Sequence, residues 1–314
     1  MRVAAIDQGT NTTRLLVADV HDGLVKDVAS RTEITRLGEG VDSRRRLLPL
    51  PIARVRNVLT EYRREAERLG AERILLIATS AVRDAENGEA FLGEIEWSYG
   101  FTTRLLDGDE EAELTFRGVT SDRRLERPTL VLDLGGGSTE FVVAGPEGIS
   151  FRESVDMGSV RLTERFLHRN PPSDGELAAC GTYVLGKIPQ IPGVNDAIGV
   201  AGTITTLAAI ELGMDVYDPD RIHGHRLSLE SIDREVDRLA RMPLAERARV
   251  TGLHPDRAPV IVAGGIIVRQ TLALLGLNSL TVSERDILHG IALEAAQLPE
   301  PVEGDAPPGA YTCC

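Results

Sequence analysis

A repeated strand–turn–strand pattern is the feature that most limits how this chain can fold. The segment from Val3 to Ala18 can be laid over the segment from Leu130 to Ala144, with an offset of 126 residues between Asp7 and Asp133. Each copy consists of an apolar strand, an aspartate, a glycine-containing turn with hydroxyl side chains, and a second apolar strand. The repeat predicts two similar α/β halves, each beginning with a β-meander whose first turn carries the polar residues.

Further strands and helices are expected in both halves. Apolar residues at helical spacing predict a helix over 52–69, with Pro51 near its start and Gly70 just past its end. The other predicted elements are third strands at 25–34 and 149–155, strands at 73–78 and 194–200, and helices at 109–117, 160–167, 174–185, 205–212, 229–241, 258–275 and 286–298. Residues 299–314 are rich in Pro, Gly and acids and are expected to form a disordered tail.

Composition and charge restrict the partners. The chain is 42% hydrophobic and 26% charged, as in ordinary soluble proteins, and its three cysteines fit neither a zinc site nor a disulfide framework. No apolar run could span a membrane and Asp7 interrupts any signal-peptide core, so a cytoplasmic protein is expected. The net charge of −13 argues against nucleic-acid and membrane partners.

The segment Arg44-Arg45-Arg46 is interpreted as a solvated loop, with electrostatic steering of a polyanion as the alternative.

The stronger of the two repeated turns lies between Asp133 and Glu140, in the sequence DLGGGSTE. Three consecutive glycines allow backbone N–H groups to approach an anion without obstruction by side chains. Ser138 and Thr139 add hydroxyl donors, and the two carboxylates could hold a divalent ion or orient water. A plain hairpin turn would also explain the glycines. The second copy of the same turn favours a phosphate site.

The segment Gly202-Thr203-Ile-Thr-Thr206 follows an apolar strand and opens a predicted helix. Unpaired N–H groups and the helix dipole favour anions at a helix N-terminus, so a second phosphate contact is one interpretation. A capping arrangement without any ligand is the other.

Four acids surround one alanine in the run from Asp109 to Glu113, between the two halves. Acids at the start of a helix are favoured by its dipole and are usually solvated. An acid at a junction between domains could instead activate water for attack on phosphorus.

Taken in order, these motifs resemble those of the exopolyphosphatase/guanosine pentaphosphate phosphohydrolase (Ppx/GppA) family. The resemblance implies an α/β fold of the acetate-and-sugar-kinase/Hsp70/actin type, with two ribonuclease-H-like domains around a central cleft. Domain I would be residues 1–113 plus 286–298, and domain II residues 114–285, without the C-terminal helical domains of longer members. The resemblance covers residues 2–298 and rests further on the segments 78–87, 157–163, 201–203, 262–265 and 282–283.

The resemblance also implies roles for single residues. Glu111 would be the base that positions the attacking water, and Asp133 and Glu140 would organise metal and water. The residues expected to bind phosphate are Asp7, Gly9, Thr10, Asn11, Thr12, Arg83, Gly135, Gly136, Gly137, Ser138, Thr139, Gly202 and Thr203. Two departures from the family pattern, either of which could shift substrate preference, are Asp107, where a serine is usual, and Glu284-Arg285-Asp286, where an aspartate–glycine pair is usual.

The implied activity is in-line attack by water on a terminal phosphoryl group of polyphosphate, with Mg²⁺ or Mn²⁺ neutralising charge. Guanosine pentaphosphate (pppGpp) is the alternative substrate, and a homodimer is expected. A sugar or acid kinase on the same fold stays open, with Gly264-Gly265 as an adenosine-pocket turn. A non-catalytic sensor of an alarmone or polyphosphate is a further alternative. The sequence does not distinguish between long polyphosphate, short polyphosphate and pppGpp.

Overall fold

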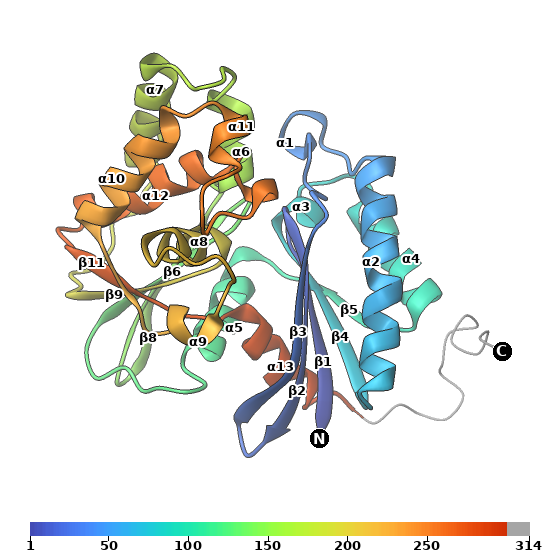
Figure 1. Cartoon of the computed structure of the whole chain (residues 1–314). Helices are drawn as coiled ribbons and strands as arrows, with labels where there is room; N and C mark the ends of the chain where they lie inside the picture. Colours follow the sequence, from blue (N-terminus) through green and yellow to red (C-terminus); the bar gives the residue numbers. More distant parts are fainter. Residues whose placement is uncertain (300–314) are drawn as a thin grey trace. The chain divides into compact units, whose positions relative to one another are not determined.

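The chain divides into two compact units in the computed structural model, which describes residues 1–299 (Figure 1). Unit 1 comprises Met1–Asp122 together with the described residues from Ile287 onward, and unit 2 comprises Arg123–Asp286. Each unit is built around one mixed β-sheet. Within residues 1–299, no helix has the length and apolar character needed to cross a membrane. The tail expected after Leu298 lies, from Glu300 on, outside the described residues.

The sheet of unit 1 has five strands in the order β3-β2-β1-β4-β5. Strand β1 pairs antiparallel with β2 and parallel with β4. Ala4 and Ile6 of β1 belong to one hydrophobic cluster, and Val3 and Ala5 belong to another. Because alternate residues of a strand face opposite sides, both faces of this sheet are buried. The strands are β1 Arg2–Gln8, β2 Thr12–His21, β3 Leu24–Ile34, β4 Arg73–Ala78 and β5 Thr102–Leu105.

Helices cover both faces of this sheet. Helices α2 and α4 supply residues to one cluster, and α5 and α13 supply residues to the other. Helix α2 buries Val55, Leu59 and Tyr62, which form one stripe at helical spacing. The helices of unit 1 are α1 Val41–Arg44, α2 Pro49–Arg68, α3 Ser80–Arg83, α4 Gly88–Tyr99, α5 Gly108–Val119 and α13 Ile287–Ala295.

Helix α13 returns to unit 1 from the end of the described chain and packs closely on α5. A Cβ atom at Gly290 would lie 2.1 Å from the carbonyl oxygen of Leu114, a distance that no side chain tolerates. Only glycine at this position allows the two helices to approach so closely.

We expect Gly290→Ala to lower the free energy of unfolding by about 1–3 kcal/mol, because the added methyl group forces α13 away from α5. The matched control is Gly93→Ala in α4, where a Cβ would meet no atom within 4 Å. This control should be neutral or stabilising by up to about 1 kcal/mol, because alanine favours helix over glycine. Urea unfolding measures both variants, and equal stability of the two would contradict the close packing at Gly290.

The sheet of unit 2 has six strands in the order β10-β11-β9-β6-β7-β8. Strands β6, β7 and β8 form an antiparallel meander, and β9 is parallel to β6. This repeats the topology of unit 1, with β10 added at the edge beside β11. The predicted repeat and the predicted α/β class are therefore confirmed. The strands are β6 Thr129–Leu134, β7 Thr139–Gly145, β8 Gly148–Val155, β9 Asp196–Val200, β10 Arg226–Ser228 and β11 Ser279–Val282.

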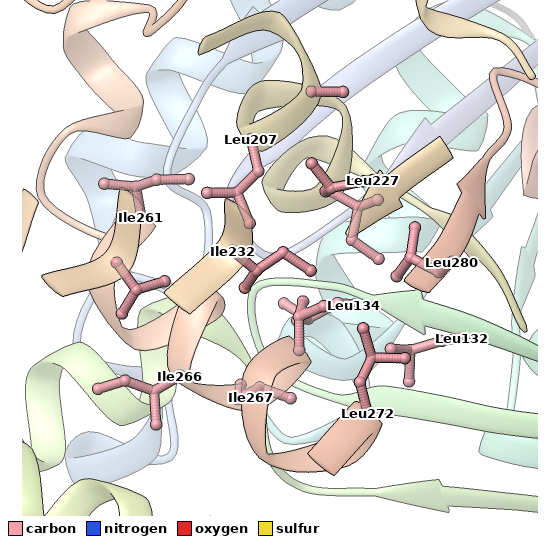
Figure 2. Close-up of a cluster of buried hydrophobic side chains, with 14 of the residues drawn as sticks. Leu132, Leu134, Leu207, Leu227, Ile232, Ile261, Ile266, Ile267, Leu272 and Leu280 are labelled. Carbon is pink, nitrogen blue, oxygen red and sulfur yellow. The ribbon is translucent and has the colours of Figure 1, made fainter. Parts of the chain in front are cut away.

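The core of unit 2 lies between its sheet and its helices (Figure 2). Leu132 and Leu134 of β6 share one buried cluster with Leu207, Ile232 and Ile267, which come from three different helices. The helices of unit 2 are α6 Ser159–Phe166, α7 Asp174–Leu185, α8 Gly202–Glu211, α9 Pro219–Ile222, α10 Leu229–Ala240, α11 Leu244–Arg247 and α12 Ile261–Leu274, with a 3₁₀ turn at Pro255–Arg257.

Gly264 and Gly265 do not form a turn. Both lie inside α12 and are buried. A Cβ at Gly264 would lie 2.5 Å from Thr203 Oγ1, and a Cβ at Gly265 would lie 2.4 Å from Val236 Cγ2. The expectation of an adenosine-pocket turn at these residues is wrong, because the glycines serve the close packing of α12 against α8 and α10.

Candidate active site

The two repeated turns close in the same way. The N–H of Gly9 donates to the carbonyl oxygen of Thr12 at 3.0 Å, and the N–H of Gly135 donates to that of Ser138 at 3.1 Å. These bonds lie at equivalent positions of the repeat, so the duplication extends from the strands to the hydrogen bonds of the turns.

In unit 2 the carbonyl groups of the turn are held from outside by the start of α6. The N–H of Ser159 donates to Gly135 at 3.0 Å, the N–H of Val160 donates to Gly136 at 2.9 Å, and Arg161 Nε donates to the Gly137 carbonyl at 2.8 Å. A Cβ at Gly158 would lie 2.3 Å from the backbone of Gly136, so only glycine permits this approach.

The same turn leaves its N–H groups available. Within residues 1–299, no acceptor takes a hydrogen bond from the N–H groups of Gly136, Gly137 or Ser138. Consecutive backbone N–H groups that are not used by the fold form a concave site for phosphate oxygens. Thr139 differs, because its hydroxyl donates to the carbonyl oxygen of Met157 and is committed to the fold.

The turn of unit 1 is fixed by the segment that follows β3. The N–H of Gly38 donates to the carbonyl oxygen of Thr10 at 2.8 Å, and the N–H of Arg36 donates to that of Asn11 at 2.9 Å. The Thr10 hydroxyl also lies 2.9 Å from the Ser80 hydroxyl at the start of α3. The residues predicted here as the facing phosphate loop therefore form one ordered turn.

The residues opposite the two aspartates distinguish the turns chemically. Asp7 pairs in register with Arg14, and the Arg14 guanidinium donates to its carboxylate at 2.6 and 2.9 Å. Asp133 pairs in register with Glu140, which is buried and accepts a hydrogen bond from Ser154 at 2.8 Å. Directly opposed residues of antiparallel strands share one face of the sheet. Unit 2 thus has two neighbouring carboxylates where unit 1 has an ion pair.

Sequence reasoning did not identify Arg14. The signal was present, because the 126-residue offset that places Asp7 on Asp133 also places Arg14 on Glu140. Comparing the charges at these two positions indicates that only the second turn offers two acidic side chains.

Asp133 and Glu140 are the predicted metal ligands. Among the described residues, no cluster of three or more His, Cys, Asp or Glu side chains could hold a metal ion. Mg²⁺ is commonly held by one or two protein carboxylates, with substrate phosphates and water as the other ligands. Two carboxylates beside a turn with unused N–H groups fit this kind of site. The one described cysteine, Cys180, is not a candidate metal ligand, because it is buried and burial raises the pKa of its thiol to about 11.

Glu111 is the one buried acid of the run in α5; Asp109, Glu110 and Glu113 are exposed. Arg83 Nη1 lies 3.4 Å from Glu111 Oε2 and donates to the carbonyl oxygen of Leu106 at 2.9 Å. The solvated interpretation therefore holds for three of the four acids but not for Glu111.

Asp107, the departure from the family pattern, is the N-cap of α5. Its side chain accepts from the N–H of Glu110 at 2.9 Å, and the Glu110 side chain accepts from the N–H of Asp107 at 3.0 Å. Aspartate and serine are equally good N-caps, so the exchange preserves the helix start that holds Glu111.

Gly202 and Thr203 lie beside the turn of unit 2. Strand β9 is parallel to β6 and Val200 pairs with Asp133, so the start of α8 lies at the same edge of the sheet as that turn. A Cβ at Gly202 would lie 1.5 Å from Arg257 Nη1, so this guanidinium rests directly on the helix start. Sequence reasoning gave Arg257 no role, since it lies about 50 residues further along the chain in a loop-like segment.

Comparison with known proteins agrees with these observations. The family model described as "Ppx/GppA phosphatase family" matches residues 16–298. Exopolyphosphatase 2 of Mycobacterium tuberculosis is 41% identical, covering 94% of this chain and 98% of the relative. The crystal structure of an Aquifex aeolicus Ppx/GppA family member has a TM-score of 0.80 at 32% identity, covering 95% and 98% of the two chains. The crystal structure of an exopolyphosphatase-like protein has a TM-score of 0.87 at 33% identity, covering 95% of this chain and 99% of the other chain.

Proposed function

Since this chain belongs to the Ppx/GppA phosphatase family, we propose that it is an exopolyphosphatase, which releases terminal orthophosphate from inorganic polyphosphate by attack of water. The observation that carries the proposal is the turn of unit 2. Its unused N–H groups, at Gly136, Gly137 and Ser138, lie next to the paired carboxylates of Asp133 and Glu140. This combination suits a phosphate group accompanied by a divalent cation.

In the proposed mechanism the backbone N–H groups of this turn bind the oxygens of the terminal phosphates. Phosphoryl transfer depends mainly on positioning and charge stabilisation, so a fixed set of N–H donors is an effective contribution. The donors are fixed because α6 holds the carbonyl groups on the other side of the turn. Asp133 and Glu140 would hold Mg²⁺ or Mn²⁺, which would neutralise phosphate charge when bound.

Glu111 is proposed to accept a hydrogen bond from the attacking water and to take its proton. Glu111 is buried and the Arg83 guanidinium lies 3.4 Å from its carboxylate, so the effect of burial, which disfavours a charged carboxylate, is opposed by a neighbouring positive charge. Arg83 would also contact the departing or terminal phosphate.

The domains are proposed to follow the two halves of the repeat. By position in the chain, Glu111 belongs to the N-terminal half, and Asp133 and Glu140 belong to the second half. The homodimer and the cytoplasmic location expected from the sequence stay predictions.

The first experiment is phosphate release by the full chain with Mg²⁺ from short polyphosphate, long polyphosphate, pppGpp and ATP, measured side by side. We expect release from polyphosphate, with loss of activity when EDTA removes the cation. Asp133→Asn, prepared in the same way, controls for contaminating phosphatases. Release from pppGpp alone would assign the chain to alarmone turnover. Tight binding of polyphosphate without any release would favour a sensor, and phosphorylation of a sugar or acid by ATP would favour a kinase.

A further inference from the structure

Three consecutive exposed arginines, Arg44, Arg45 and Arg46, form a cationic cluster on unit 1. Within the described part of the chain, none of the three makes an ion pair or a side-chain hydrogen bond. The chain as a whole carries a net charge of −13, so its surface is mainly acidic. A cluster of uncompensated guanidinium groups on such a surface attracts anions locally, against the overall field.

The backbone conformation at Arg45, the central residue of this cluster, is one that favours glycine. Arg45 has a φ of +53°, in the left-handed region that glycine occupies with the least strain. Arg36, earlier in the same segment, also has a positive φ of +50°. Arg45 therefore keeps a cation at a position where glycine would be the more stable choice.

The segment that carries the cluster is held firmly at both ends. Val41 and Leu47 are buried in the core of unit 1. The N–H of Leu47 donates to Asn87 Oδ1 at 2.9 Å, and Asn87 Nδ2 donates back to the Leu47 carbonyl oxygen at 3.1 Å. The Arg45 carbonyl oxygen accepts from the N–H of Glu86 at 2.9 Å. The three guanidinium groups thus project from a fixed backbone, and little backbone ordering is needed when they bind an anion.

The same segment contacts the phosphate turn of unit 1. Residues 36–38 hold the carbonyl groups of Thr10 and Asn11, and a Cβ at Gly38 would lie 2.2 Å from Thr10 Cγ2. Figure 1 shows α1 at the end of the sheet where β1 passes into β2. The cluster therefore lies at the same end of unit 1 as the predicted facing phosphate loop.

We propose that Arg44, Arg45 and Arg46 form a distal subsite for the internal phosphates of long polyphosphate, and that this subsite raises kcat/KM for long chains relative to short ones. The inference rests on the proposed exopolyphosphatase function. Each internal phosphate of the chain carries a negative charge, and guanidinium groups bind phosphate oxygens in a bidentate manner. Tripolyphosphate and pppGpp have no phosphates beyond the first few and cannot use such a subsite.

The test compares the wild-type chain with the cluster variant R44A/R45G/R46A. Glycine is used at Arg45 because it relieves the left-handed strain, so the variant is expected to fold. The matched control R63A/R64A/R68A also removes three arginines, from the last turns of α2. Since α2 has 20 residues and begins just after the cluster, these arginines lie about 20–30 Å away, beyond the Debye length of about 10 Å in 0.1 M salt.

We expect the ratio of kcat/KM for long polyphosphate to kcat/KM for tripolyphosphate to fall about tenfold in the cluster variant and less than about twofold in the control. Affinity for long polyphosphate, measured by calorimetry in EDTA so that no hydrolysis occurs, should fall in parallel. If the kcat/KM ratio falls equally in both variants, or does not fall in either, the subsite proposal is overturned. The proposed function is not affected by this outcome as long as the wild-type protein hydrolyses polyphosphate. A wild-type protein that neither binds nor hydrolyses polyphosphate would refute the proposed function, and the subsite with it.

Discussion

Replacing Glu111 by Gln is expected to lower the rate of phosphate release about 10²–10⁴-fold, with little effect on the stability of the fold. The amide keeps the size of the side chain but cannot accept a proton, and removal of a general base costs a factor of this order. Helix α5 should remain intact, because its N-cap is formed by Asp107 and Glu110 and does not involve Glu111. Steady-state kinetics on long polyphosphate measure the loss, which should appear in kcat more than in KM.

Glu113→Gln is the matched control for this experiment. It removes the same charge from the same helix, two residues further on, at an exposed position. We expect its kcat to lie within about twofold of the wild-type value, because an exposed charge is screened by solvent. If Glu111→Gln and Glu113→Gln have equal rates, Glu111 is not the base.

Gly158→Ala is expected to lower phosphate release at least about 10²-fold by displacing the turn of unit 2. The added Cβ would lie 2.3 Å from the backbone carbon and oxygen of Gly136 and 2.4 Å from the N–H nitrogen of Gly137. A shift of the turn of about 1 Å misplaces N–H donors that must match phosphate oxygens, and errors of this size can cost about 10² in rate. The loss should be accompanied by weaker binding of a non-hydrolysable polyphosphate analogue.

Gly175→Ala serves as the control, since a Cβ at Gly175 in α7 would meet no atom within 4 Å. It should leave kcat/KM unchanged and the melting temperature equal or slightly raised. Circular dichroism separates a misplaced turn from a failure to fold. A folded Gly158→Ala protein with wild-type activity would show that the position of this turn is not critical.

The fold could be predicted from the sequence because its local signals repeat. The aspartate–glycine turns mark the ends of β1 and β6, and the long helix α2 bears buried apolar residues at clear helical spacing. Most of the elements that were missed are short, although the twelve-residue helix α4 was missed as well. Strands β5 and β11 have four residues each, too few for a periodic pattern, and they are defined by pairing with β4 and β9.

The candidate site was only partly predictable, because sequence patterns do not reveal which side chains oppose each other. Asp7 pairs with Arg14 across the strands, a contact that the sequence analysis did not include, and its expected role in binding phosphate stays a prediction. In a sequence, a glycine that forms a ligand turn cannot be told from a glycine that allows two helices to pack closely. The contact with Thr203 identifies Gly264 as a helix-packing residue. The contact of Arg257 with Gly202 depends on loop geometry that no local pattern encodes.

The exchange of Arg14 for Glu140 at matching positions of the repeat also has a meaning for the substrate. Inorganic polyphosphate has two identical ends, so the substrate itself specifies no direction. A protein made of two equal halves would offer that polymer two equivalent binding modes. Because one half carries an ion pair at this position and the other carries two carboxylates, the two halves of this chain are not equivalent for such a polymer. A cation that accompanies a phosphate group would find two carboxylates at the second copy of the turn and a carboxylate already paired with a guanidinium at the first.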